Sequence, residues 1–201
     1  MWSELEGHAA QQELVRLLAR HSLSTGSFKL ASGRTSTYYI DARLTTMRPE
    51  GLALIGPLAL SAVRARGWQP DAVGGLTLGA DPVAYAIAYA SATRPPAVRA
   101  FTVRKEPKDH GAGKLIEGPF AAGDRVVVVE DVITSGGSAL RAIRAVSAAG
   151  GQVLGVLAVV DREEGGRQAL EAEGFGVIAL VQVGEILDTA KDGAPGNTTP
   201  S

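Results

Sequence analysis

Apolar residues recur along the chain with two spacings, one typical of helices and one typical of strands. Leu17 and Leu18 follow Leu14 by three and four residues, which predicts an amphipathic helix over 11–21. Short apolar runs predict strands over 72–75, 97–103, 125–129, 153–160 and 177–181, between helices predicted over 49–66, 82–91, 138–149 and 167–173. Pro57 is expected to kink or restart its helix. This alternation predicts an α/β fold, with a parallel sheet covered by helices on both faces.

The two ends of the chain depart from the central pattern. After a polar stretch at 22–27, the segment 28–41 predicts two short strands joined by a turn, an appendage before the main fold. The tail 191–201 is rich in Gly, Pro, Thr and Asn, and we expect it to be disordered. The chain is therefore divided into an N-terminal helix with its appendage (1–45), a core (46–190) and a tail (191–201).

Composition narrows the classes of function. With 201 residues, 45% of them hydrophobic, the chain suits one compact domain. Its 20 Lys and Arg against 21 Asp and Glu leave a net charge of −1, which favours neither nucleic acid nor a membrane as partner. The absence of cysteine excludes disulfides and Cys-ligated zinc, and three scattered histidines do not favour a His-rich metal site. The acidic, polar N-terminus does not resemble a secretory signal, so we expect a cytoplasmic protein.

The segment 126–138 joins a strand of four valines to two acidic residues, a loop of small residues and a predicted helix. Small residues allow backbone N–H groups and the helix N-terminus to converge on a phosphate, and Thr134, Ser135 and Ser138 add hydroxyl groups. No Gly-Lys-Ser/Thr follows the glycines, so the segment is not the P-loop of a nucleoside triphosphatase. These residues predict a phosphate cradle.

The acidic pair in the same segment refines this prediction. Glu130 and Asp131 would repel a phosphate unless they face sugar hydroxyls or a divalent cation, and a ribose 5-phosphate fits that arrangement. A simpler reading stays open, in which Gly136 and Gly137 only make a tight turn and the two carboxylates cap the next helix.

The order strand, acidic pair, small-residue loop and helix resembles the 5-phosphoribosyl 1-diphosphate signature of the type I phosphoribosyltransferases. The basic segment 104–111 resembles the catalytic loop of the orotate phosphoribosyltransferases, the segment 28–41 resembles their N-terminal hood, and Asp161-Arg162 also matches. These motifs run from residue 28 to 162 in the family's order. The resemblance implies a type I phosphoribosyltransferase-like parallel sheet flanked by helices, with a small N-terminal hood.

The resemblance also implies an activity, the transfer of ribose 5-phosphate from 5-phosphoribosyl 1-diphosphate to orotate in pyrimidine biosynthesis. The transition state of such a transfer is like an oxocarbenium ion leaving a charged diphosphate, so the site must neutralise charge and exclude water. Mg²⁺ is the expected cofactor, held mainly by substrate oxygens, and no residue is assigned as a direct metal ligand. In the family the basic loop reaches into the neighbouring subunit's site, so a homodimer is expected, with small-molecule substrates as the other partners.

Matching positions imply roles for individual residues. Lys108 is expected to stabilise the leaving diphosphate, and Asp131 is expected to be the second catalytic residue, located at the ribose. The residues expected to bind phosphoribosyl diphosphate are Arg104, Lys105, Lys108, His110, Glu130, Asp131, Val132, Ile133, Thr134, Ser135, Gly136, Gly137 and Ser138. Those expected to bind orotate are Tyr39, Ile40, Thr134 and Arg162, the last through its planar fork. Asp41 is assigned no role.

Simpler readings remain for several of these residues. The basic segment could be a solvated run of charge, Tyr38 and Tyr39 could be ordinary core aromatics, and Arg162 could form a surface ion pair with a following glutamate. Two other functions also remain. A purine phosphoribosyltransferase should lack the 104–111 loop as written, and a non-catalytic regulator that senses phosphoribosyl diphosphate should show a DNA-binding module or a basic face.

The chain departs from the family at two lysines that some members carry. Ala31 stands directly before the Ser-Gly turn of the hood where such members have a lysine, and the diphosphate loop (75–82) has none, with Gly79 in the corresponding place. This loop is therefore expected to bind diphosphate through backbone N–H groups and Thr77 alone.

Overall fold

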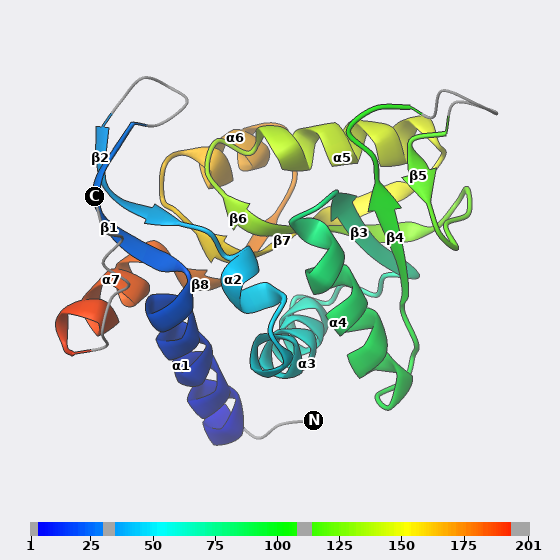
Figure 1. Cartoon of the computed structure of the whole chain (residues 1–201). Helices are drawn as coiled ribbons and strands as arrows, with labels where there is room; N and C mark the ends of the chain where they lie inside the picture. The colour runs from blue at the N-terminus through cyan, green and yellow to red at the C-terminus, as the bar shows by residue number, and fades with distance from the viewer. Residues whose placement is uncertain (1–3, 30–34, 108–113, 194–201) are drawn as a thin grey trace.

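The computed structural model describes residues 4–29, 35–107 and 114–193, and a six-stranded sheet lies at its centre (Figure 1). The strand order is β5-β4-β3-β6-β7-β8. All neighbouring strands are parallel except β4 and β5, which are antiparallel. The strands are β3 (Ala72–Leu76), β4 (Arg99–Val103), β5 (Ile116–Glu117), β6 (Arg125–Ile133), β7 (Gln152–Asp161) and β8 (Val177–Gln182). The predicted parallel α/β sheet is confirmed.

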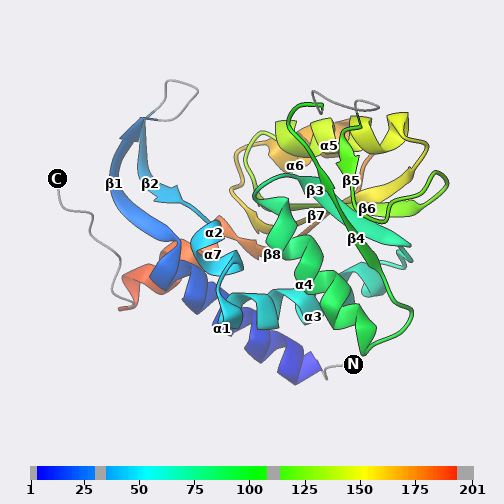
Figure 2. The same ribbon diagram turned by 45° about the vertical axis from the view of Figure 1, so that its right-hand side comes forward.

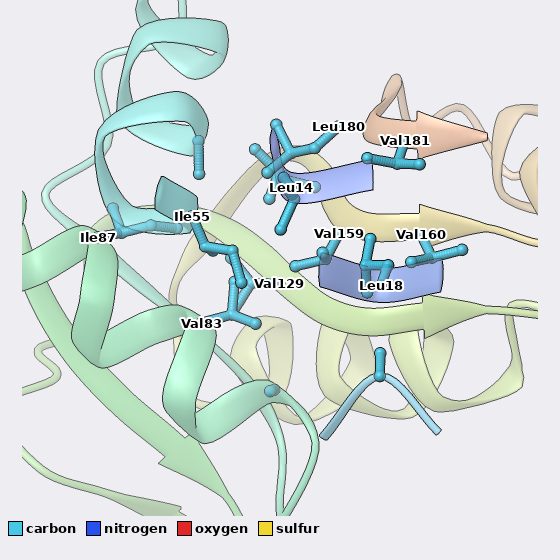
Figure 3. Close-up of a cluster of buried hydrophobic side chains, with 14 of the residues drawn as sticks. Leu14, Leu18, Ile55, Val83, Ile87, Val129, Val159, Val160, Leu180 and Val181 are labelled. Carbon is cyan, nitrogen blue, oxygen red and sulfur yellow. The ribbon is translucent and has the colours of Figure 1, made fainter. Parts of the chain in front are cut away.

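Helices cover both faces of this sheet because its central strands are apolar on both sides. Along β6, Val127 and Val129 pack into one cluster of buried side chains while Val126 and Val128 pack into the other, as the two-residue period of a strand requires. The first cluster, shown in Figure 3, lies under α1, α3, α4 and α7, and the second lies under α5 and α6. These helices are α1 (Glu4–His21), α3 (Pro49–Ala65), α4 (Ala80–Ala92), α5 (Gly137–Ala148), α6 (Gly166–Ala172) and α7 (Val183–Lys191).

The predicted appendage is an antiparallel pair of strands, β1 (Leu23–Lys29) and β2 (Thr35–Ile40), that stands beside the main sheet (Figure 2). Leu23 pairs with Ile40, and both side chains are buried at the base of the hood against α1 and the first core cluster. The short helix α2 (Arg43–Thr46) then leads from the hood into α3. Much of the polar stretch predicted over 22–27 is therefore the beginning of β1, where mostly exposed positions accept polar side chains.

The helix α3 continues through Pro57, so the predicted restart of the helix at this residue is wrong. The helix continues because it packs tightly against α4. Gly56 lies so close to α4 that a Cβ placed on it would be 2.4 Å from the carbonyl oxygen of Ala86. Tertiary packing of this kind outweighs the hydrogen bond that a proline removes. No helix in the described ranges is both long and apolar enough to cross a membrane.

The C-terminal helix α7 was not predicted, although it has a clear local signal. Gln182 and Glu185 form a capping box, and Val183 and Ile186 are buried against the first core cluster. Lys191, where the predicted tail begins, is the last residue of this helix, and residues 194–201 lie outside the described residues.

Candidate active site

The carboxyl ends of four parallel strands, β3, β4, β6 and β7, meet at one edge of the sheet, where the hood faces them. Parallel strands place the loops that follow them side by side, which is where open α/β sheets bind ligands. An open cleft of ≈ 320 Å³ lies there. It is lined by hood residues Tyr39, Ile40, Asp41, Ala42 and Arg43, by Leu76, Thr77, Leu78 and Gly79 after β3, by Lys105, by Glu130, Asp131, Val132, Thr134 and Ser138, and by Arg162.

A smaller hollow of ≈ 70 Å³ adjoins Glu130 and is formed by residues 132–139. Gly136 is the N-cap of α5 with φ of 80°, a left-handed conformation that favours glycine. A Cβ at Gly136 would also lie 3.0 Å from the carbonyl oxygen of Gly166. The loop therefore directs the start of the 12-residue helix α5 towards the hollow, as a phosphate cradle requires. The alternative in which Glu130 and Asp131 cap this helix is wrong, because no side chain in the described part of the chain makes a capping hydrogen bond to it.

The two carboxylates of the segment are both withdrawn from solvent. Glu130 is only 5% exposed, and its Oε1 has no hydrogen-bond partner in the part of the chain that the structure describes. Burial, together with the negative charge of Asp131, raises the pKa of Glu130 to about 8. Burial also raises the pKa of Asp131, whose Oδ1 accepts a 2.9 Å hydrogen bond from the Val132 N–H. An incoming hydroxyl donor or cation would satisfy these groups.

Gly79 brings the diphosphate loop into direct contact with the acidic pair. A Cβ placed on Gly79 would lie 2.4 Å from Asp131 Oδ1 and 2.6 Å from Oδ2. A side chain at this position would displace the Asp131 carboxylate, which gives a physical reason for glycine where some family members carry lysine. The peptide bond between Thr77 and Leu78 in the same loop is cis. Ala31, the other departure, lies outside the described residues.

Arg162 is buried rather than on the surface, at 6% exposure. Its Nη2 lies 2.6 Å from Glu164 Oε1, and its guanidinium carbon lies 5.2 Å from the centre of the Tyr38 ring. Among the described residues, neither Nε nor Nη2 has a hydrogen-bond partner of acceptable geometry, so the contact of Nη2 with Glu164 is an ion pair rather than an aligned hydrogen bond. The ion pair between Arg162 and a following glutamate therefore exists, as the simpler reading expects. However, Arg162 lies in the wall of the cleft, where its remaining N–H groups can donate to a ligand.

The two hood tyrosines have different surroundings because they point to opposite sides of β2. Tyr38 packs against the first core cluster and under Arg162. Tyr39 is 42% exposed, lines the cleft and contacts Phe28, with ring centroids 5.8 Å apart. The reading of core aromatics is therefore right for Tyr38 only.

The basic segment after β4 is only partly described. Lys105 lines the cleft, whereas Arg104 turns away, with Nη1 3.6 Å from Glu117 Oε1 and Nε donating to the Glu106 carbonyl oxygen at 3.3 Å. Lys108 and His110 lie outside the described residues, so their roles stay predictions.

Sequence reasoning missed the pair Asp41 and Arg43, which both line the cleft. Asp41 accepts hydrogen bonds from Arg43 Nε and Nη2, each at 2.8 Å, and this pairing lowers the pKa of Asp41. Arg43 also contributes a positive field that opposes the rise in the pKa of Asp131. The two-residue spacing after the hood strand is the signal that could have found the pair.

Among the described residues, no group of three or more His, Cys, Asp or Glu side chains is arranged to hold a metal ion. Glu130 and Asp131 are the carboxylates in the cleft wall nearest the phosphate hollow, and they fit a hard cation that keeps most of its ligands from water or substrate.

Comparison with known proteins gives consistent matches. The phosphoribosyl transferase domain family matches residues 46–176. An orotate phosphoribosyltransferase of Aquifex aeolicus is 48% identical over 180 residues, which is 88% of this chain and 97% of that protein. Orotate phosphoribosyltransferase of Mycobacterium tuberculosis H37Rv, solved with Fe(III) dicitrate, superposes with a TM-score of 0.78 at 45% identity, covering 88% of this chain and 98% of that one. A second structure of the mycobacterial enzyme, with 5-phospho-alpha-D-ribosyl 1-diphosphate, has a TM-score of 0.72 at 38% identity over 89% and 92% of the two chains.

Proposed function

This chain belongs to the phosphoribosyl transferase domain family, among the orotate phosphoribosyltransferases, and from that premise we propose which of its residues carry the reaction. The reaction moves ribose 5-phosphate from 5-phosphoribosyl 1-diphosphate to orotate, releases diphosphate and serves pyrimidine biosynthesis. The resemblance drawn from the sequence is confirmed, and the purine and regulatory alternatives are set aside. One observation carries the assignment of residues: a single cleft is lined by the hood, the diphosphate loop, the acidic pair and Arg162.

The phosphoribosyl group is proposed to bind with its 5-phosphate in the hollow at the start of α5. The hydroxyl groups of Thr134, Ser135 and Ser138 can donate hydrogen bonds to the phosphate there, beside the N–H groups of the helix N-terminus. The sugar then lies over Glu130 and Asp131, whose oxygens accept hydrogen bonds from the 2′- and 3′-hydroxyls. Buried acceptors that lack a partner gain most from such donors, which supports this orientation.

Orotate is proposed to bind between the hood and Arg162. The exposed ring of Tyr39 and the backbone of Ile40 form one wall, and the guanidinium of Arg162 faces the substrate carboxylate. The ion pair with Glu164 holds the guanidinium in place, and the N–H groups at Nε and Nη2, which make no hydrogen bond among the described residues, stay available to the substrate. A planar fork of donors selects a carboxylate, which orotate has and uracil lacks.

Departure of the diphosphate requires positive charge and donors at the opposite end of the cleft. The proposed groups are Lys105 in the cleft wall, Lys108 and His110 from the same basic segment, and the N–H groups of the diphosphate loop. Arg104 is no longer proposed for this role, because its guanidinium turns towards Glu117 and the Glu106 carbonyl oxygen. Mg²⁺ when bound neutralises charge on the diphosphate oxygens. Glu130 fits a role beside the cation, because its unpartnered carboxyl with a pKa raised to about 8 would be stabilised as an anion there.

A homodimer is proposed to complete each site, with the basic loop acting on the neighbouring subunit. Supporting it, Tyr85 and Tyr89 stand one turn apart on α4 and are 53% and 84% exposed, and Leu78 in the diphosphate loop is 53% exposed. Tyr85 also hydrogen-bonds Thr102, two residues before Arg104, so this apolar surface adjoins the base of the basic segment. Burying such apolar side chains against a second subunit would stabilise the dimer. The cytoplasmic location stays a prediction.

The activity is tested by following the loss of orotate absorbance with phosphoribosyl diphosphate, with and without Mg²⁺. Uracil, hypoxanthine and adenine serve as competing bases. We expect orotate alone to be consumed, and only with Mg²⁺ present. Consumption of a purine base at a similar rate would contradict the proposed carboxylate recognition.

A further inference from the structure

We propose that Asp81 is a positioning residue that holds the turn 77–79 of the diphosphate loop, an inference that rests on the function proposed above. Asp81 lies in the first turn of α4, directly after the turn. Its Oδ2 accepts a hydrogen bond from Thr77 Oγ1 at 2.7 Å, and its Oδ1 accepts one from Thr102 Oγ1 at 2.8 Å. One carboxylate therefore ties the turn after β3 to the neighbouring strand β4.

Thr77 is held from two sides by this arrangement. Its N–H donates to the carbonyl oxygen of Val103 at 2.8 Å, and its hydroxyl donates to Asp81. Both hydrogen-bond donors of Thr77 are thus used inside the protein. The expectation that Thr77 itself donates to the diphosphate does not fit this geometry, and we assign it an anchoring role instead.

The donors that remain for a diphosphate are backbone N–H groups. Within the described ranges, the N–H groups of Leu78 and Gly79 donate to no protein acceptor. The loop carries no lysine, so its affinity depends on where these N–H groups point, and donors held in place before binding contribute most. Loss of the anchor would let the turn move without changing any group that touches the ligand.

The turn also supports the ribose side of the cleft. Gly79 packs directly against the Asp131 carboxylate, so a shift of the turn would change the position of that carboxylate as well. Thr102 is in turn hydrogen-bonded to the Tyr85 hydroxyl at 3.1 Å, which extends the network along α4. Asp81 therefore links the diphosphate loop, β4 and α4 at a point outside the cleft lining.

A purely structural reading of Asp81 is that its charge only stabilises the helix N-terminus. Glu50 in the first turn of α3 has that role without the hydroxyl partners, so Glu50→Gln is a matched control. The informative variants are Asp81→Ala, Asp81→Asn, which keeps one acceptor, and Thr102→Val, which removes one donor at constant shape. For each folded variant, the KM for phosphoribosyl diphosphate, the KM for orotate and the midpoint of urea unfolding are measured.

We expect Asp81→Ala to raise the KM for phosphoribosyl diphosphate roughly tenfold while the KM for orotate changes less than about twofold. Asp81→Asn and Thr102→Val should show smaller rises in the same parameter, and Glu50→Gln should show none. An unchanged KM for phosphoribosyl diphosphate in Asp81→Ala, or an equal rise in both KM values, would overturn the proposal.

Calorimetric titration with diphosphate and Mg²⁺ separates this test from that of the proposed function. Asp81→Ala should bind diphosphate roughly tenfold more weakly than the unmodified protein, whether or not orotate is consumed. If Asp81→Ala and the unmodified protein bind diphosphate with equal affinity, the positioning role of Asp81 is wrong even if the enzyme is active. Failure to consume orotate would count against the function alone.

Discussion

Replacing Glu130 with glutamine should stabilise the ligand-free protein at high pH much more than at low pH. The pKa of Glu130 is raised by burial and by Asp131 from 4.5 to about 8, so the folded protein keeps a proton that the unfolded chain has lost. Stability contributed by this group is fully present below pH 4.5 and is lost as pH rises towards 8. Between about pH 5 and about pH 8 the loss amounts to about 3.5 kcal/mol, and glutamine, which does not titrate, avoids it.

The assay is urea unfolding of the unmodified protein and Glu130→Gln at several pH values across this interval. The exposed Glu173 supplies the control variant Glu173→Gln, whose stability should follow that of the unmodified protein at each pH. The free energy of unfolding of Glu130→Gln should rise relative to both as the pH is raised. A difference that is constant across the interval would refute the argument that this buried carboxyl binds its proton more tightly in the folded state.

Further variants test single contacts. Arg162→Ala should raise the KM for orotate at least tenfold and that for phosphoribosyl diphosphate far less, and Arg162→Lys, which keeps the charge without the fork, should resemble it; equal effects on both substrates would count against carboxylate recognition. Gly79→Ala should weaken the binding of phosphoribosyl diphosphate measured by calorimetry, because its Cβ would meet the Asp131 carboxylate, whereas Gly7→Ala in α1, with no atom within 4 Å of the new Cβ, should be neutral. Lys108→Ala should lower turnover by roughly ten- to a thousandfold. Mixing it with Asp131→Asn should restore part of the activity in hybrid dimers if Lys108 acts on the neighbouring subunit. Equal activity before and after subunit exchange would rule out action on the neighbouring subunit.

The sequence predicts the central fold well because each core element carries its own periodicity. The valines of β6 alternate between two clusters, and the helices on either side have apolar stripes that fit those clusters. One prediction failed where contacts distant in sequence decide the structure: Pro57 sits in a continuous α3 because α4 packs against it. The missed α7 is a different case, because its capping box of Gln182 and Glu185 is local and could have been recognised.

The candidate site was predictable as a set of motifs but not as a set of contacts. Residues 130–138 were identified because a strand, an acidic pair and small residues are contiguous in the chain. The contact of Gly79 with Asp131 and the hydrogen bond of Thr102 to Asp81 join segments about 50 and 20 residues apart, and only the folded chain brings them together. The lack of a partner for the Glu130 oxygen likewise depends on the folded surroundings of that side chain. The pairing of Arg43 with Asp41 is local, and its two-residue spacing could have been recognised.

We propose that one cleft holds both substrates, with the phosphate at the start of α5 and the orotate carboxylate at Arg162. A crystal structure of the protein with phosphoribosyl diphosphate, Mg²⁺ and an unreactive analogue of orotate would test this arrangement. We expect the 5-phosphate within hydrogen-bond distance of Thr134 and Ser138, the ribose hydroxyls on Glu130 and Asp131, and the carboxylate of the analogue on Arg162. A 5-phosphate bound away from the loop 134–138, or an analogue whose carboxylate does not touch Arg162, would contradict it.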